Sequence, residues 1–268
     1  MAPAPNPIAL ITGASAGIGA AFARLLAERG HECALAARRA DRLTTLADAI
    51  AAAGHKRPHV IALDLGERDG PARLARELAA RGLEPAIVVN NAGFGLRGPA
   101  ADLDRAEQLA MIDLNVRALT ALSLMFVDSL KRHRGGLINV ASLSGFFPGP
   151  GMAVYFAGKA FVRSFSEAIA HELAREEVRV TCICPGPVPT EFQARAGLHE
   201  RSPPFLSRSA EQIAREGYDA FMRGQSVLVT GIPNKIAGAL PRFMSRALVL
   251  RAVEGFVKRA GPPTASSR

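Results

Sequence analysis

The stretch IALITGASAGIGAAFARLLAERG, residues 8–30, decides the fold class of this chain. It starts with a short apolar run, passes through a turn containing Gly13, Gly17 and Gly19, and continues with apolar residues at helical spacing. A buried strand, a tight turn and a covering helix give this order of patterns. The stretch therefore predicts a strand at 8–12 and a helix at 18–29.

The same alternation continues along the chain. Further apolar runs with strand character lie at 32–36, 59–63, 86–90, 136–141, 178–183 and, more briefly, 226–230. Segments with helical spacing lie between them, at 41–53, 71–80 and 152–176 among others. Strands that alternate with helices predict a parallel sheet covered on both faces. The expected class is α/β, a doubly wound parallel sheet of the Rossmann type in three α/β/α layers.

Composition favours one globular domain. The 268 residues contain 49% hydrophobic side chains and show no linker-like shift, so we expect a single domain over 1–268. Within it, 190–225 is expected to form a substrate lid and 235–268 a C-terminal extension. No apolar run approaches the roughly 18 residues of a membrane span, and MAPAPNP lacks the features of a signal peptide. A cytoplasmic location is therefore expected.

Charge and cysteine content indicate neither a nucleic-acid partner nor a metal. The net charge is +9, but the basic residues are spread along the chain without a basic block. Cys33, Cys182 and Cys184 favour buried thiols, with a metal or redox pair as the alternative. The six histidines form no metal-ligand pattern.

The glycine turn has the features of a nucleotide site. Glycines at a first strand-to-helix turn let a pyrophosphate approach the N–H groups at the start of the helix. The candidate contacts are Gly13, Ser15, Gly17, Ile18 and Gly19. An ordinary glycine-rich turn without a ligand is the alternative.

A second motif, YFAGK, places Tyr155 and Lys159 four residues apart in a helical segment, so both side chains should leave one helix face. A phenol normally has a pKa of about 10, and a nearby ammonium group is expected to lower it. The pair therefore suits acid–base chemistry.

Together, these motifs resemble those of the short-chain dehydrogenase/reductase family, whose fingerprints are TGxxxGIG and YxxxK. The resemblance extends in order over about 8–195, with NVAS for the commoner NVSS and YFAGK for YSASK. It implies hydride transfer between a nicotinamide and a carbonyl or secondary alcohol. It also implies that Ser142 bonds the reacting oxygen, with Ser144 as the alternative, and that Asn115 holds a water linked to Lys159.

The end of the second strand distinguishes the cofactors. An acidic residue there would bind ribose hydroxyls, whereas arginine pairs with a 2′-phosphate. The sequence has Arg38 and Arg39, which favour NADP(H) over NAD(H). The resemblance adds contacts to the adenine, the sheet end and the nicotinamide: Asp64, Leu65, Asn91, Ala92, Gly93, Pro185, Gly186, Val188 and Thr190. A helix N-cap or a turn role at Asp64 and a polar turn at Asn90 and Asn91 are the alternatives.

Apolar residues near these motifs suggest the substrate. Phe146, Phe147, Met152, Phe192, Leu198, Phe205 and Leu206 are expected to wall a site for a bulky or apolar ketone, aldehyde or 3-oxoacyl compound. Packing of a lid or a subunit contact is the alternative.

The segment 235–260 mixes apolar and basic residues in a possible pair of helices interrupted at Pro241. We expect it to pack over the cleft or a neighbouring subunit, with contact to an anionic membrane as the alternative. The resemblance implies a homo-oligomer, a dimer or a tetramer. A non-catalytic NADP(H)-binding sensor or scaffold is the alternative function.

Overall fold

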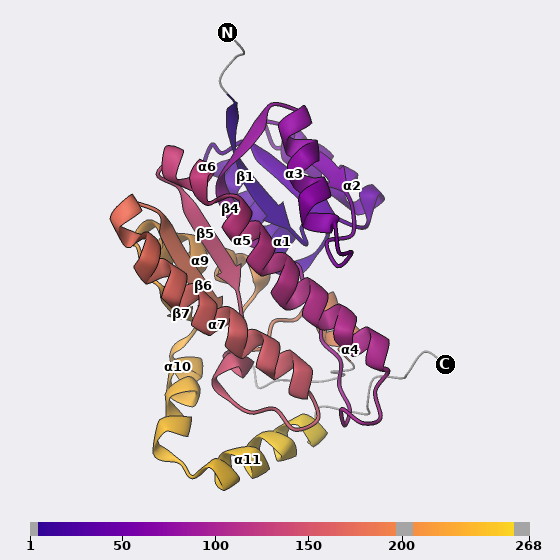
Figure 1. Ribbon diagram of the computed structural model, residues 1–268, viewed down its shortest axis with the longest axis vertical. Coiled ribbons are helices and arrows are strands. Elements are labelled where there is room, and N and C mark those ends of the chain that lie inside the picture. Colours follow the sequence, from indigo (N-terminus) through magenta and orange to yellow (C-terminus); the bar gives the residue numbers. More distant parts are fainter. Residues whose placement is uncertain (1–4, 197–205, 260–268) are drawn as a thin grey trace.

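A computed structural model describes residues 5–196 and 206–259 (Figure 1). Seven parallel strands form one sheet in the order β3-β2-β1-β4-β5-β6-β7. The strands are β1 Asn6–Thr12, β2 Cys33–Ala37, β3 His59–Ala62, β4 Leu83–Asn90, β5 Gly136–Val140, β6 Arg179–Cys184 and β7 Val227–Val229. The strand order reverses direction between β1 and β4.

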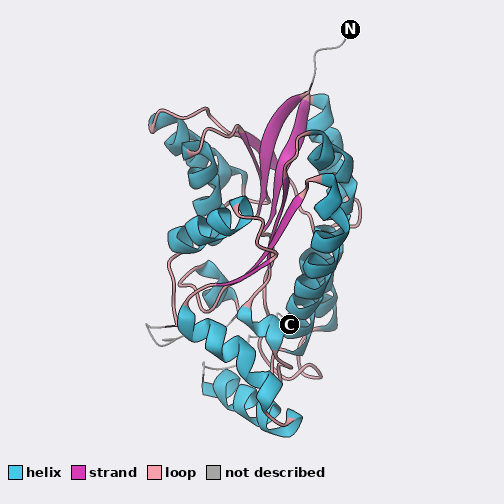
Figure 2. Cartoon of the chain, turned by 90° about the vertical axis from the view of Figure 1, so that its left-hand side faces the viewer, coloured by secondary structure: helices cyan, strands magenta, loops and turns pink. Residues whose placement is uncertain are grey.

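Helices cover both faces of this sheet (Figure 2). The α-helices are α1 Gly17–Glu28, α2 Ala40–Ala52, α3 Gly70–Ala80, α4 Arg105–Ile112, α5 Leu119–Met125, α6 Val127–Arg132, α7 Ala153–Leu173, α8 Glu191–Arg195, α9 Ala210–Met222, α10 Ile232–Ala239 and α11 Arg246–Arg259. A π-helix, η1 Asp113–Ala118, joins α4 to α5. Three 3₁₀ turns are η2 Leu143–Phe146, η3 Ala174–Glu176 and η4 Leu240–Phe243.

Alternate residues of β1 face opposite sides of the sheet, and both sides are buried. Ala9 and Ile11 pack with α1, α2 and α9, whereas Ile8 and Leu10 pack with α3, α5, α6 and α7. A strand buried on both faces needs apolar residues at every position, which explains its continuous apolar run. The predicted doubly wound, three-layer fold is therefore confirmed.

The segment expected to form a lid, 190–225, is divided in the structure. Residues 210–222 form α9, which starts with a capping box between Ser209 and Gln212 and packs against α1 in the core. This part covers the sheet instead of the cleft, because its apolar face meets α1. Residues 197–205, with Leu198 and Phe205, lie outside the described residues.

The C-terminal segment forms two helices separated by η4, which contains Pro241. The three cysteines are buried and free, as the sequence predicted. Among the described residues, no helix combines the length and apolar character needed to cross a bilayer. In the same ranges, no group of three or more His, Cys, Asp and Glu side chains is arranged to hold a metal ion.

Candidate active site

The candidate residues gather at the carboxyl ends of the central strands. Gly13 follows β1, Asn91 follows β4, and Ser142 and Pro185 come just after β5 and β6. Ligands of open α/β sheets bind at this edge, beside the point where the strand order reverses. The fold thus brings residues that are far apart in the sequence to one crevice.

The glycine turn requires its glycines for packing. Gly13 and Gly17 have φ values of +65° and +55°, which disfavour side chains. A Cβ on Gly19 would lie 2.4 Å from the carbonyl oxygen of Gly13. No side chain caps the start of α1, and its first turn contains no acidic residue. Its free N–H groups therefore make this helix end suited to a phosphate group.

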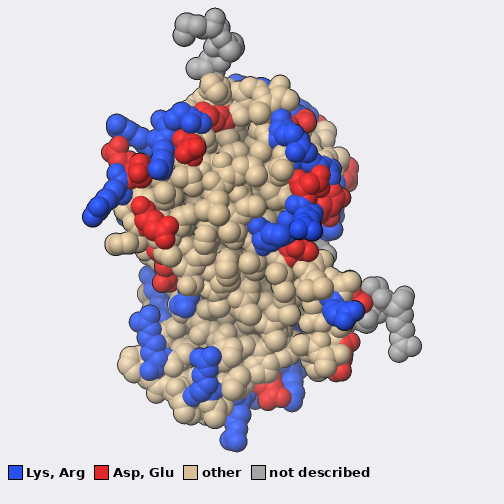
Figure 3. All heavy atoms as spheres, in the orientation of Figure 1, with Lys and Arg blue, Asp and Glu red and all other residues tan. Residues whose placement is uncertain are grey.

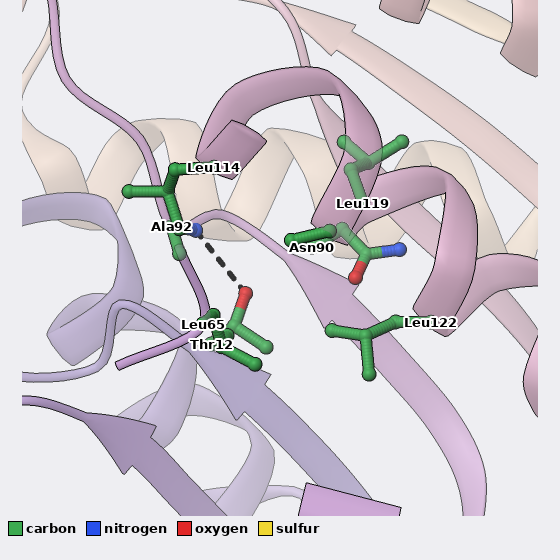
Figure 4. A pocket seen from close by; sticks show the side chains of 8 residues that line it. Thr12, Leu65, Asn90, Ala92, Leu114, Leu119 and Leu122 are labelled. Carbon is green, nitrogen blue, oxygen red and sulfur yellow. Dashed lines mark hydrogen bonds between the residues drawn. The ribbon is translucent and has the colours of Figure 1, made fainter. Parts of the chain in front are cut away.

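Thr12 connects β1 to the loop after β4, a role that the motif analysis missed. Its Oγ1 accepts hydrogen bonds from the backbone N–H groups of Asn91, at 3.0 Å, and Ala92, at 3.1 Å. Figure 4 shows the bond to Ala92. The side chain of Asn91 donates to the carbonyls of Thr12 and Gly13. Thr12 is the first letter of the TGxxxGIG fingerprint, so its motif position could have identified it. These bonds hold the loop against the glycine turn.

A cavity of about 10 Å³ lies behind this junction and is shown in Figure 4. Its lining includes the predicted cofactor residues Leu65 and Ala92, together with Asn90. The buried Oδ1 of Asn90 has no hydrogen-bond partner among the described residues. At about 10 Å³, the cavity is at the lower limit of the space that one water molecule needs.

Arginine side chains lie beside the glycine turn. Arg39 donates to Ser15 Oγ at 2.9 Å and to Glu191 Oε2 at 2.8 Å. Arg42 pairs with the same carboxylate, and these two cations hold the pKa of Glu191 below its ordinary value. The motif analysis missed Arg42 and Glu191, because only folding brings α8 to the start of α2.

Arg38 and Asp64 approach each other at 3.6 Å. Asp64 Oδ1 also accepts a hydrogen bond from the backbone N–H of Gly66 at 2.8 Å, so this carboxylate stabilises the turn after β3. Asp64, the predicted adenine contact, therefore lies next to Arg38, a predicted contact of the 2′-phosphate. Asp64 also stabilises a turn, which was the alternative role expected for it.

Tyr155 and Lys159 lie on one buried face of α7, as their spacing predicted. The ammonium nitrogen of Lys159 is 5.8 Å from the centre of the Tyr155 ring and donates to the Val140 carbonyl at 2.8 Å. Ser142 caps η2, and its hydroxyl lies close enough to the Tyr155 phenol to favour the charged form of that phenol. The three side chains thus converge at one point.

The pKa values differ from the expectation. Burial raises the pKa of Tyr155 to about 12, although the nearby hydroxyls of Ser142 and Ser144 act in the opposite direction. Burial lowers the pKa of Lys159 to about 8. The net pKa of Tyr155 is therefore raised, and the expectation of a lowered tyrosine pKa is wrong for this structure. The physical reason is that desolvation dominates and the ammonium bonds the Val140 carbonyl rather than the phenol.

Asn115 lies within the π-helix η1, next to Lys159. Its Oδ1 accepts from the backbone N–H of Phe94 at 3.1 Å, and its Nδ2 donates to the Phe94 carbonyl at 2.8 Å. A Cβ on Gly93 would come within 2.9 Å of Asn115 Oδ1 and 3.8 Å of Lys159 Nζ. The Asn115 side chain thus anchors the loop after β4, and π-helical turns of this kind are frequent at functional sites.

The loop after β6 crosses the front of the crevice. The Pro185 carbonyl accepts from Leu143 N–H at 2.8 Å. Thr190 packs against Gly17, where an added Cβ would lie 3.0 Å from the Thr190 methyl group. Gly186 lies against Asn234, a buried residue of α10 that the motif analysis missed, and Val188 packs in the core. The loop therefore connects the serine turn with the glycine turn.

An apolar cluster surrounds Tyr155. The Phe192 ring lies 5.4 Å from the Tyr155 ring, and Met152 and Phe147 belong to the same cluster, as expected. Members that the sequence did not indicate are Phe94, Leu96, Phe156 and Val257. The expected wall residue Phe146 is an exception: its ring packs under the guanidinium of Arg163 at 4.3 Å, away from this cluster. The backbone carbonyl of Leu206 accepts a hydrogen bond from Asn234 at 3.0 Å, and the wall role of the Leu206 side chain stays a prediction.

Comparison with known proteins places this geometry in context. Residues 7–201 match the family model described as short chain dehydrogenase. Sulfoacetaldehyde reductase 2 from Chromohalobacter salexigens is 35% identical over 215 residues, which are 79% of this chain and 84% of that protein.

Two solved structures are also similar. A short-chain dehydrogenase from Sphingobium yanoikuyae in complex with NADPH is 29% identical, with a TM-score of 0.77 and coverage of 89% of this chain and 95% of that one. The bulky-bulky ketone specific alcohol dehydrogenase from Comamonas testosteroni is 27% identical, with a TM-score of 0.73 and coverage of 90% and 94%. The family model, the relative and the shared fold agree: this chain is an oxidoreductase that belongs to the short-chain dehydrogenase family.

Proposed function

We propose that this chain is an NADP(H)-dependent carbonyl reductase or alcohol dehydrogenase. The observation that supports this most is the convergence of Ser142, Tyr155 and Lys159 in a buried site beside the uncapped start of α1. A proton donor and a phosphate-binding helix end at one crevice are what reduction by a dinucleotide needs.

The residues fit the 2′-phosphorylated cofactor. The first-turn N–H groups of α1 suit the pyrophosphate, and Arg39, already bonded to Ser15, suits the 2′-phosphate together with Arg38. Asp64 and Leu65 would lie at the adenine. The rest of the cofactor site would be lined by Asn91, Ala92, Gly93, Pro185, Gly186, Val188 and Thr190. The NADPH complex of the Sphingobium relative supports this assignment.

In the proposed reaction, Tyr155 donates its phenolic proton to the carbonyl oxygen during reduction and accepts it back during oxidation. When bound, NADP(H) donates or accepts the hydride. Ser142 hydrogen-bonds the reacting oxygen and holds it beside the phenol. The raised pKa of Tyr155 keeps the proton on the phenol at neutral pH, and the nearby Lys159 charge stabilises the phenolate that donation leaves.

The apolar cluster around Tyr155 supports a bulky or apolar substrate, such as a ketone, an aldehyde or a 3-oxoacyl compound. Phe192, Met152 and Phe94 offer no charge to the space beside the phenol. The bulky-ketone specificity of the Comamonas relative points the same way, whereas the sulfoacetaldehyde reductase has a small anionic substrate. The apolar lining favours the first class.

An apolar face supports assembly into a homo-oligomer. Leu109, Ile112, Leu124, Met125 and Phe161 are exposed on α4, α5 and α7. Exposed apolar side chains on neighbouring helices are typical of a subunit interface. We propose that two copies of the chain pair through this face, which analytical ultracentrifugation of Leu124→Lys would test by loss of the dimer.

The test of the proposed activity is a panel of ketones, aldehydes and secondary alcohols assayed with NADPH, NADH and their oxidised forms. Tyr155→Phe is expected to lower turnover by at least about 100-fold and to leave NADPH binding, measured by fluorescence, intact. The chain contains two tyrosines, so Tyr218→Phe is a matched control, since Tyr218 bonds His31 away from the site. Equal activity of both variants would overturn the mechanism.

A further inference from the structure

The last two helices expose a set of large apolar side chains. We call them, with the basic residues between them, the C-terminal surface, which spans 232–259. Its apolar members are Ile232, Ile236, Leu240, Phe243, Leu248, Leu250 and Phe256. Phe243 is 85% exposed, Ile232 71% and Ile236 62%, the highest values among the exposed large hydrophobic residues of the described chain. Such exposure is costly unless another surface covers it.

The exposed side chains are not needed for packing within the chain. Ile232 and Ile236 of α10 and Leu240, the first residue of η4, follow one another at spacings of four and form one stripe. The buried side of the helix is supplied by Asn234 and Gly238. On α11, the inward positions are Val249 and Val257, while Leu248 and Phe256 remain exposed. Each helix therefore packs against the chain with one side and exposes large apolar side chains on another.

The charge of this surface selects its partner. The basic residues are Lys235, Arg242, Arg246, Arg251, Lys258 and Arg259, and Glu254 is the one acidic residue in 232–259. Glu254 pairs with Lys258 at 2.7 Å, so the other cations lack an acidic neighbour within this segment. In Figure 3, basic side chains predominate at the lower end of the molecule, where Figure 1 places α10 and α11. Apolar side chains interspersed with Lys and Arg are typical of helices that lie in a membrane interface.

We propose that the C-terminal surface docks on an anionic lipid surface. Phe243 and the Ile232, Ile236 and Leu240 stripe enter the interface, and the flanking cations contact the lipid phosphates. A second copy of the chain fits less well, because pairing about a two-fold axis would place two strongly basic surfaces against each other. The separate apolar face on α4, α5 and α7 has no comparable excess of positive charge.

Docking at this surface would place the active site next to the lipid. Val257, on the packed side of α11, belongs to the apolar cluster that contains Tyr155, and its Cγ1 approaches Gly151. The packed side of α11 thus contributes to the apolar cluster around Tyr155. The docking proposal itself is independent of the proposed function, because it rests on exposure and charge alone.

Co-sedimentation of the full chain with vesicles tests the proposal. We expect binding to vesicles of equal parts phosphatidylcholine and phosphatidylglycerol, weak binding to phosphatidylcholine alone, and loss of binding in high salt. Arg242→Gln and Arg246→Gln should each lower the partition coefficient about fivefold. Phe243→Ala with Ile236→Ala should lower it by at least about fivefold.

Matched controls are Arg57→Gln and Met222→Ala, which remove an exposed cation and an exposed apolar side chain elsewhere. Both should bind vesicles as the unaltered chain does, and all variants should keep the same circular dichroism spectrum. Equal binding to neutral and anionic vesicles, or equal losses in the controls, would overturn the proposal. So would dissociation of an oligomer in lipid-free solution by the Phe243 and Ile236 variant, because that result assigns the surface to a second copy.

Discussion

Arg39 joins the glycine turn to α8: its guanidinium donates to Ser15 at 2.9 Å and to Glu191 at 2.8 Å. The side chain that suits the cofactor 2′-phosphate is therefore already bonded to a carboxylate of this chain. Glu191 directly follows Thr190, at the start of the segment that leads to the substrate side. A phosphate and the Glu191 carboxylate would compete for the same donors.

Glu191→Gln should strengthen NADP(H) binding. Removing the competing charge frees Arg39 and Arg42, and an exposed ion pair is worth about 0–1 kcal/mol, so the KM for NADPH should fall up to about fivefold. The KM for NADH, which lacks the phosphate, should change little. Initial rates with each cofactor measure both values.

The opposite change provides the control for this prediction. Arg39→Gln should raise the KM for NADPH about tenfold or more and leave that for NADH nearly unaltered, because it removes a charge-assisted donor. Glu177→Gln breaks an exposed ion pair with Arg134, away from the cofactor site, and should leave the KM values for NADPH and NADH unchanged. A rise in the KM for NADPH in Glu191→Gln would show that the carboxylate helps to bind the cofactor.

Carbonyl reduction should weaken as the pH rises through about 8. Lys159, with its pKa lowered to about 8, loses its charge in that range, whereas Tyr155, with its pKa raised to about 12, keeps its proton. The dependence of kcat/KM on pH, which reports the free enzyme, measures this with a substrate that does not titrate. A profile that stays flat across that value would contradict the assignment.

The same pKa shift affects stability. Between about 8 and the ordinary lysine value of 10.5, the unfolded chain keeps the Lys159 proton that the folded chain has lost. The contribution of Lys159 to the free energy of unfolding therefore rises with pH in this window. Urea titrations at several pH values should show that this contribution is absent from Lys159→Met.

Gly95→Ala should restrict the substrate site. An added Cβ would lie 3.0 Å from Phe192 Cζ and 3.3 Å from Tyr155 Cδ2, so it would crowd the two rings that border the expected substrate site. We expect kcat/KM for a bulky ketone to fall about tenfold and that for a small ketone by less than about twofold. Gly255→Ala, where nothing lies within 4 Å of the added Cβ, is the matched control. Equal losses for both ketones would contradict a role in substrate size.

Asn139→Ala should destabilise the chain. Asn139 is buried between Asn90 and Ser166, accepting from the first at 2.9 Å and donating to the second at 2.9 Å. It thereby ties β4 and β5 to α7. Losing it costs about 1–3 kcal/mol in the free energy of unfolding, because a buried partner is left unpaired. Urea denaturation should also show a smaller loss for Ser166→Ala, and an unchanged midpoint in Asn139→Ala would contradict this role.

The strands, and the helices expected at 18–29, 41–53, 71–80 and 152–176, could be predicted from the sequence to within a few residues. Strand, turn and helix each depend on neighbours in the chain, so the apolar run at 8–12 and the glycines at 13, 17 and 19 were sufficient. The pairing of Tyr155 with Lys159 on one helix face is local in the same sense. The sequence could not predict that α9 packs against α1 in the core instead of forming part of a lid. The reason is that an amphipathic helix can bury its apolar face against either surface.

Taken alone, the sequence determined the order of strands and helices, the glycine turn and the positions of Ser142, Tyr155 and Lys159, since these follow from periodicity and motif spacing. The tertiary structure decided which residues contact each other: Glu191 binds Arg39, Asn115 bonds the backbone of Phe94, and Val257 joins the apolar cluster around Tyr155. It also set the pKa values of Tyr155 and Lys159. The reason is that hydrogen bonds and desolvation depend on distances through space, which the distance along the chain does not specify.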